Sequence, residues 1–324
     1  MNSDLYNSEV KEEFLNTLKN ESTRHVYKNI FIKTAEIEEQ EGKDLYTFSL
    51  EELKDVLYTL NCTTINSIKT YGTGLTSYVD WAISKGWRSN INPLRMFPGA
   101  WFENFVDKSK KLYFSESEIN DIVDKLVNFQ DAAIVQMLFE GVSGHELSEL
   151  VSLKVNDIKE NNILILKDQD KTRELKVSDK CIRLIDSAIR ENEYQAKNGT
   201  ATGYNKTYNL MNSDYVLRTS VNKRNVEGAP DRHLIYRRLT TISEFFDYKH
   251  LNAKNISRSG MLKTAKDLYE RDGKLDKEQM DEIAEKFNLN MIKGYNNKIS
   301  PNYHQISQYV NKENIEALYP PEVE

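Results

Sequence analysis

The sequence predicts a mainly α-helical protein of two domains, with a small antiparallel β-sheet in the second domain. Apolar side chains recur at helical spacing through the first hundred residues and again after residue 115. Residues 162–177 break this pattern, because their apolar residues run together or alternate, as they do in strands. A segment with Pro98, Gly99 and several lysines separates the two helical parts, so we expect a domain boundary there.

The first domain, residues 1–98, is predicted to be all helix. Apolar positions indicate helices over 8–19 and 23–39, and Ser49 with Glu52 forms a capping-box pattern before the next one. A longer helix is expected from Thr64 onward, and the two glycines in it, at positions 72 and 74, indicate close contact with another element. Residues 99–114 are interpreted as an interdomain linker.

The second domain, residues 115–324, is predicted to be a helical domain that carries the sheet. It opens with a capping-box pattern at Ser115 and Glu118. A β-hairpin follows, with its turn at residues 168–170, and "DYVLRT" at 214–219 is expected to add a third strand. Further helices are expected over 234–246, 257–269, 276–287 and 303–318.

The composition argues against a membrane protein and against a disulfide framework. Hydrophobic residues make up 39% and charged residues 29% of the 324 residues, and the start of the chain is polar, without a signal peptide. The two cysteines, Cys62 and Cys181, lie far apart and fit a reducing compartment. We expect a cytoplasmic protein with no membrane partner.

The net charge of −6 conceals an asymmetry along the chain. Residues 204–263 contain 11 Lys and Arg against 5 Asp and Glu, a local charge of +6, so the remaining residues carry −12. Such an asymmetry is typical of a protein that binds a polyanion on one surface, although a solvated helix face could also produce it.

The segment "SGHELSELVSLKVNDI", residues 143–158, suggests three interpretations. His145 with nearby acidic residues could suggest zinc, but the motif lacks the second His at i+4, where Glu149 stands, so we expect no metal and no cofactor. The apolar stripe of Leu147, Leu150 and Leu153 also fits an ordinary core helix.

The third interpretation is a resemblance to tyrosine recombinases, the phage integrase family. The segment resembles their box Thr-Gly-Leu-Arg-x-Ser-Glu-Leu-x-x-Leu-x-x-x-Asp-Ile, and the resemblance extends over nearly the whole chain. It implies a clamp of a helical core-binding domain and an α+β catalytic-like domain. The whole-chain pattern also resembles the recombinase-like master repressors of SPβ-type Bacillus prophages.

The resemblance assigns the positions of the recombinase chemistry. Glu146 stands where the family has its first catalytic Arg, and Asn255 stands where the family has the His of its His-x-x-Arg box. Arg258 keeps the Arg of that box, Tyr309 takes the place of the nucleophile, and Lys171 in the hairpin fits the catalytic Lys. An acidic residue near a phosphate and the loss of two donors predict that strand cleavage is lost.

We therefore expect a catalytically inactive, sequence-specific double-stranded DNA-binding protein, a prophage repressor that maintains lysogeny at phage operators. The resemblance also implies that the protein is associated with the nucleoid of the bacterial host of a prophage. The alternatives are an active recombinase whose missing Arg is replaced by Lys171 or Arg173, and a protein-interaction module that no longer binds DNA. The short C-terminal tail implies weak self-association, because tails in the family often dock on a neighbour, and a phage regulatory protein is a further candidate partner.

The expected DNA contacts are Thr64, Ser67, Lys69, Lys85, Arg88, Arg218, Lys223, Arg224, Arg232, Arg237, Arg238 and Arg258.

Overall fold

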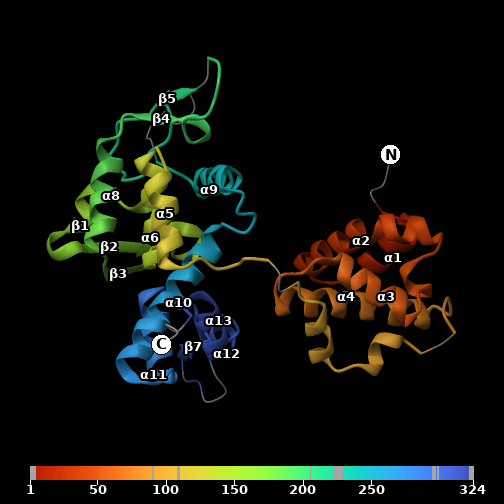
Figure 1. Cartoon of the computed structure of the whole chain (residues 1–324). Coiled ribbons are helices and arrows are strands. Elements are labelled where there is room, and N and C mark those ends of the chain that lie inside the picture. Colours follow the sequence, from red (N-terminus) through yellow and green to blue (C-terminus); the bar gives the residue numbers. More distant parts are fainter. Residues whose placement is uncertain are drawn as a thin grey trace. The chain divides into compact units, whose positions relative to one another are not determined.

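The computed structural model of the chain describes residues 5–89, 91–107, 110–204, 206–221, 229–293, 297 and 299–320. It divides into two compact units, Met1–Lys110 and Lys111–Glu324 (Figure 1). Among the described residues, no helix combines the length and the apolar character that a membrane crossing needs.

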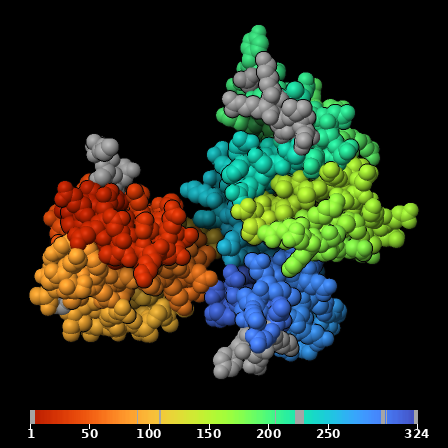
Figure 2. Space-filling view, turned by 180° about the vertical axis from the view of Figure 1, so that it is seen from behind, coloured from red at the N-terminus to blue at the C-terminus, as the bar shows by residue number. Residues whose placement is uncertain are grey.

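The first unit is a bundle of helices. In Figures 1 and 2, α1 and α2 form one layer of this unit, and α3 and α4 form the other. Ser49 caps α3 with the predicted capping box, and Thr64 caps α4 by accepting a hydrogen bond from the backbone N–H of Ser67. The elements of this unit are α1 (Ser8–Thr17), α2 (Glu21–Glu41), η1 (Leu45–Thr47), α3 (Leu50–Thr59), α4 (Ile65–Ser84), η2 (Pro93–Met96) and η3 (Gly99–Phe105).

The two glycines of α4 lie where other elements come close to the helix backbone. A Cβ on Gly72 would lie 2.3 Å from the ring of Phe102, and one on Gly74 would lie 2.7 Å from Ile30. Phe102 and Phe105 of η3 are buried in the core of the first unit. The interpretation of 99–114 as a linker is therefore wrong for residues 99–105, because their aromatic side chains pack on α4.

The second unit contains the remaining helices and three small antiparallel sheets. Ser115 caps α5 with the second predicted capping box. Its helices are α5 (Glu116–Lys125), α6 (Phe129–Glu140), α7 (Ser148–Ser152), α8 (Asp179–Arg190), α9 (Arg232–Phe246), α10 (Ala253–Asp272), α11 (Lys277–Lys286), α12 (Tyr303–Ser307) and α13 (Lys312–Leu318). Short 3-10 turns are η4 (His145–Leu147), η5 (Val155–Asp157), η6 (Glu160–Asn162) and η7 (Ala196–Gly199).

Helix α6 is the centre of this unit, and α5, α8 and α10 pack around it. Ten of its twelve residues are buried, from Gln130 to Phe139. Helix α10 approaches α6 so closely that a Cβ on Gly260 would lie 1.8 Å from the carbonyl oxygen of Phe139. Only glycine fits at this crossing.

The predicted hairpin is present, but the predicted third strand is not. β2 (Ile163–Asp168) pairs with β3 (Lys171–Lys176), and β1 (Ile158–Lys159) adds to the other edge of β2. Residues 214–219 form no strand; Tyr215 makes a single bridge to Lys154, and Val216 and Leu217 are both buried. The remaining sheets are pairs, β4 (Glu193–Gln195) with β5 (Thr207–Asn209) and β6 (Met291–Lys293) with β7 (Ile299–Pro301).

Most predicted helices agree with the structure to within two residues at each end, and two differ by more. Helix α10 begins at Ala253, four residues before the predicted start, because Asn252 caps it by accepting from the N–H of Asn255. The predicted helix over 303–318 is two helices, because Asn311 is extended and caps α13 separately. Tyr309 therefore lies in the connection between α12 and α13.

Candidate functional site

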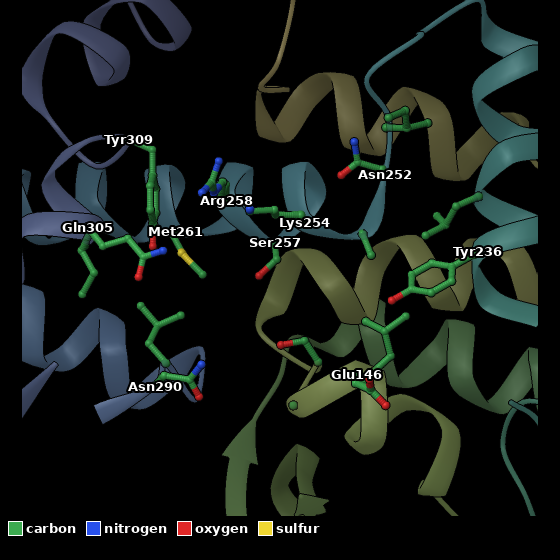
Figure 3. Close-up of a pocket in the computed structure, with 18 of the residues that line it drawn as sticks. Glu146, Tyr236, Asn252, Lys254, Ser257, Arg258, Met261, Asn290, Gln305 and Tyr309 are labelled. Carbon is green, nitrogen blue, oxygen red and sulfur yellow. The ribbon is translucent and has the colours of Figure 1, made fainter. Parts of the chain in front are cut away.

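The second unit carries a cavity of about 600 Å³ beside the start of α10. Its wall is formed by the turn before α7, one face of α9, the first turns of α10 and the segment from β7 to α13. Its apolar floor comes from several leucines, Met261 and Ile306, and amide side chains stand among them. Figure 3 shows Lys254, Ser257, Arg258 and Met261 on α10, with Tyr309 at one side of the cavity and Tyr236 at the other. A concave apolar space with a few convergent polar groups is typical of a binding site.

Glu146 reaches this cavity from a strained turn. Glu146 and Leu147 both have left-handed backbone angles, with φ of 53° and 65°, and each such non-glycine residue costs about 1–3 kcal/mol. The carboxylate of Asp168 stabilises the turn by accepting from the backbone N–H of His145 at 2.9 Å and from the hydroxyl of Ser148 at 2.6 Å. Although burial raises the pKa of Asp168, these hydrogen bonds and others bring it below its usual value.

Glu149 stabilises the other side of the turn and links it to the hairpin through Arg173. Its buried carboxylate accepts from the backbone N–H of Ser143 at 2.9 Å and from Arg173 at 2.6 and 2.8 Å. The guanidinium of Arg173 also donates to the carbonyl oxygens of Gly141 and Lys286, each at 2.8 Å. Glu149 is therefore a structural residue, and Arg173 is fully engaged away from the cavity.

The carboxylate of Glu146 forms an ion pair with the guanidinium of Arg232, at the first residue of α9. Both side chains are partly exposed. Glu146 is the only acidic residue among the described residues that line the cavity. Its negative charge is thus compensated by Arg232 rather than by the cations of α10.

Arg258 and Tyr309 meet on the wall of the cavity. The guanidinium carbon of Arg258 lies 4.3 Å from the centre of the Tyr309 ring, a cation–π contact. Burial raises the pKa of the Tyr309 hydroxyl, and the nearby charge of Arg258 opposes this without reversing it. The phenol is therefore protonated at neutral pH and is a poor nucleophile.

The other two positions assigned to recombinase chemistry do not line the cavity. Asn255 is buried, and its side-chain amide donates to the carbonyl oxygen of His250 at 2.9 Å. Lys171 is exposed at the start of β3. Of the five positions, the cavity brings together Glu146, Arg258 and Tyr309.

Two of the expected DNA contacts are wrong, because their side chains are interior. Arg218 is 5% exposed and donates to the carbonyl oxygens of Ala188, Ile189 and Glu191. Arg238 is 4% exposed and donates to the carbonyl oxygen of Arg218 at 3.0 Å. Both guanidinium groups bond to the protein itself, so they cannot reach a phosphate. Lys223 and Arg224 lie outside the described residues, whereas Arg237 on α9 is exposed.

The DNA contacts expected in the first unit differ in whether their side chains are already bonded within the protein. Arg88 is half-buried and donates to the carbonyl oxygens of Tyr46 and Phe48, so it serves the fold rather than a ligand. Lys69 pairs with Glu103 and Lys85 with Glu13, each at 2.6 Å, in exposed ion pairs that a phosphate could replace. The remaining two, Thr64 and Ser67, hydrogen-bond to each other at the start of α4.

The cavity also includes a cation that the sequence analysis did not single out, Lys254. It precedes Arg258 by four residues on α10, and this spacing of two positive charges is visible in the sequence. For a metal ion, by contrast, the described residues offer no cluster of three or more His, Cys, Asp or Glu side chains.

Comparison with known proteins assigns the family. Residues 113–320 match "MrpR, C-terminal catalytic domain", and residues 5–84 match "MrpR, N-terminal core-binding domain". The chain belongs to the MrpR family. It is 33% identical over 326 residues to the SPβ prophage-derived uncharacterized protein YopR of Bacillus subtilis (strain 168), with 98% of each chain covered.

Among the solved structures similar to this MrpR-family chain are a lambda integrase and a recombinase. A lambda integrase dimer bound to a COC′ core site is similar at 10% identity with a TM-score of 0.50, over 98% of this chain and 77% of that one. XerA recombinase is similar at 14% identity with a TM-score of 0.42, over 98% of this chain and 100% of that one. The predicted fold class, a mainly helical two-domain recombinase fold with a small antiparallel sheet, is confirmed.

Proposed function

We propose that this chain is a sequence-specific double-stranded DNA-binding protein that represses prophage genes and maintains lysogeny, and that it does not cleave DNA. Membership of the MrpR family and the recombinase fold support DNA binding, and the origin of the YopR relative supports a prophage setting. The observation that carries the proposal is that Glu146, Arg258 and Tyr309 line one cavity. The resemblance assigns Arg258 and Tyr309 to the Arg and the nucleophile of a recombinase, and Glu146 to the place of the first catalytic Arg.

The charges in the cavity argue against strand cleavage. Cleavage of a phosphodiester needs positive charge on the non-bridging oxygens while negative charge builds up, and losing one such donor costs about 10²–10³ in rate. Glu146 offers a carboxylate instead, and the amide of Asn255 is engaged with His250. The rate is lowered further because Tyr309 is protonated and because Asn255 stands where the family has the His that acts as acid or base.

An active recombinase remains the second candidate, and the contact between Arg258 and Tyr309 is the observation that favours it. Its missing Arg would have to come from elsewhere. Arg173 is bound to Glu149 and to two carbonyl oxygens, which argues against its taking that role. Lys171 would have to move to the cavity from the exposed start of β3.

A suicide-substrate assay on phage promoter duplexes tests the proposal. We expect the full-length chain to shift these duplexes in a gel and to leave no covalent adduct. An adduct that forms with the natural chain and is lost in Tyr309→Phe would establish the recombinase alternative. Absence of any shift, even at low salt, would leave only a protein-interaction module.

Repression itself is tested with a reporter. Duplexes recovered by immunoprecipitation of the chain from a lysogen would be placed upstream of a reporter gene. We expect the chain to lower reporter output from those sequences and to leave scrambled versions unchanged. Equal output in its presence and absence would contradict the repressor role while leaving DNA binding intact.

A further inference from the structure

Helix α10 places two positive charges next to each other at the cavity. Lys254 and Arg258 are separated by one turn of the helix, and both line the cavity. In Figure 3 the amine of Lys254 lies on the side that faces Arg258. Like charges at this spacing destabilise a helix, and the proximity of Arg258, followed by burial, lowers the pKa of Lys254.

The other cations of α10 are all compensated by acids. Lys263 pairs with Asp267 at 2.7 Å, Lys266 pairs with Glu270 at 2.7 Å, and Arg271 pairs with Glu282 at 2.7 Å. Within the part of the chain that the structure describes, neither Lys254 nor Arg258 has a carboxylate partner. The guanidinium of Arg258 lies over the ring of Tyr309 and is hydrogen-bonded to the hydroxyl of Tyr113, and both of these groups are neutral or have a raised pKa. The repulsion between the two cations is therefore left uncompensated at the cavity.

Glu146, the one acid among the described residues of the cavity wall, does not remove this excess. The carboxylate of Glu146 is paired with Arg232, which approaches from α9. Asn290 and Gln305 add neutral amides, which can donate hydrogen bonds to an anion. An anion that bridges the two cations would relieve their repulsion and would find further donors around it.

We propose that Lys254 and Arg258 together hold one phosphate group of a bound DNA duplex, and that Lys254 supplies the second positive charge in place of the Arg that Glu146 replaces. Arg258 offers a planar fork to two phosphate oxygens, and Lys254 offers a point charge on a flexible stem. This inference rests on the proposed DNA binding, and it makes Lys254 a positioning residue for the backbone rather than a reader of bases.

Binding titrations of the full-length chain against an operator duplex over a salt series test the role of Lys254. We expect Lys254→Gln to weaken binding by roughly tenfold, as for a hydrogen bond to a charged group. The slope of log affinity against log salt should become shallower by about 0.9, the effect of one phosphate contact. Lys254→Arg should restore both quantities. Lys266→Gln is the matched control, because it removes the same charge from the same helix away from the cavity.

Neutral methylphosphonates placed singly along the duplex locate the phosphate. We expect one position at which the substitution weakens binding of the natural chain but has little further effect on Lys254→Gln. Identical affinity, slope and methylphosphonate profile for Lys254→Gln and the natural chain would overturn the inference while the proposed function stands.

A calorimetric titration with adenosine monophosphate separates a duplex phosphate from a free one. If the natural chain binds no duplex, the proposed function fails independently of Lys254. If adenosine monophosphate then binds the natural chain and not Lys254→Gln, the assignment of the phosphate to a duplex is overturned and the site belongs to a free phosphate monoester. If the natural chain binds neither the duplex nor adenosine monophosphate, the proposed anion site is overturned as well.

Discussion

At the scale of single residues, Glu146 lowers the positive charge of the cavity in two ways. Its carboxylate adds a negative charge to the wall, and it also pairs with the guanidinium of Arg232. Such an exposed ion pair contributes little to stability, about 0–1 kcal/mol, so its removal should leave the fold intact. We therefore expect a substitution of Glu146 to change duplex binding rather than folding.

The first prediction follows for Glu146→Gln. We expect tighter duplex binding and a salt slope steeper by about 0.9, because Arg232 is released and one negative charge is removed. Salt-dependent binding titrations measure both. Glu160→Gln, an exposed change in the same unit, is the control, and unchanged or weaker binding by Glu146→Gln would contradict the role of the ion pair.

The second prediction concerns Lys11, which is fully buried in the first unit. Its amine donates to Glu38 at 2.5 Å and to Asp44 at 3.2 Å. Lys11→Met would leave two buried carboxylates without a cation, so we expect a loss of about 3–5 kcal/mol in the free energy of unfolding. Urea unfolding measures it, with the exposed Lys28→Met as the control. A loss no larger than that of the control would show that the cluster does not hold the unit together.

The same cluster makes the first unit sensitive to pH, which is the third prediction. Burial raises the pKa of Glu38 to about 7 from 4.5, although Lys11 opposes the shift. The folded unit therefore binds this proton more tightly than the unfolded chain does, and the resulting stability is complete below 4.5 and lost as the pH rises through about 7. We expect the midpoint temperature of thermal unfolding of this unit to decrease as the pH is raised from about 5 to about 8. The decrease should be smaller in Glu38→Gln. A constant midpoint over that range would refute the contribution of Glu38.

At the scale of elements, α10 carries Lys254 and Arg258 to the cavity wall, and this helix packs closely on α6. The fourth prediction is that Gly260→Ala destabilises the second unit by about 1–3 kcal/mol, since the new Cβ would lie 1.8 Å from the Phe139 carbonyl oxygen and the helices must separate. Thermal unfolding and duplex titration should both show the change. Gly99→Ala is the control, because its Cβ would meet open space.

The elements that the sequence predicted correctly are those with local signals. The capping boxes at Ser49 and Ser115 lie within four residues, and both are present. The predicted third strand over 214–219 is wrong because this segment makes only an isolated bridge, at Tyr215, and has no partner strand, which only the tertiary structure reveals. The burial of Arg218 and Arg238 and the excess charge at Lys254 likewise depend on elements far away in sequence. The resemblance assigned the five positions of recombinase chemistry, whereas only the fold shows which of their side chains reach the cavity.

At the scale of the whole molecule, the chain has separate hydrophobic cores. One cluster consists of residues of the first unit alone, around Phe31 and Tyr78, and the other two consist of residues of the second unit alone. The two clusters of the second unit both include residues of α10, Ile256 in one and Leu262 in the other, so we expect them to unfold together. The cores of the two units share no helix, and such cores unfold as separate cooperative units when the interface between them is small.

The fifth prediction is that calorimetry of the full-length chain resolves two unfolding transitions. Lys11→Met should lower the midpoint of one, and Gly260→Ala should lower the midpoint of the other, so the two variants assign the transitions to the units. A saturating operator duplex should raise both midpoints, because a ligand stabilises every unit that binds it in proportion to the logarithm of its concentration over the dissociation constant. A duplex that raises only the transition lowered by Gly260→Ala would show that the first unit does not contact DNA, and the two-domain clamp would then be wrong even though the second unit binds.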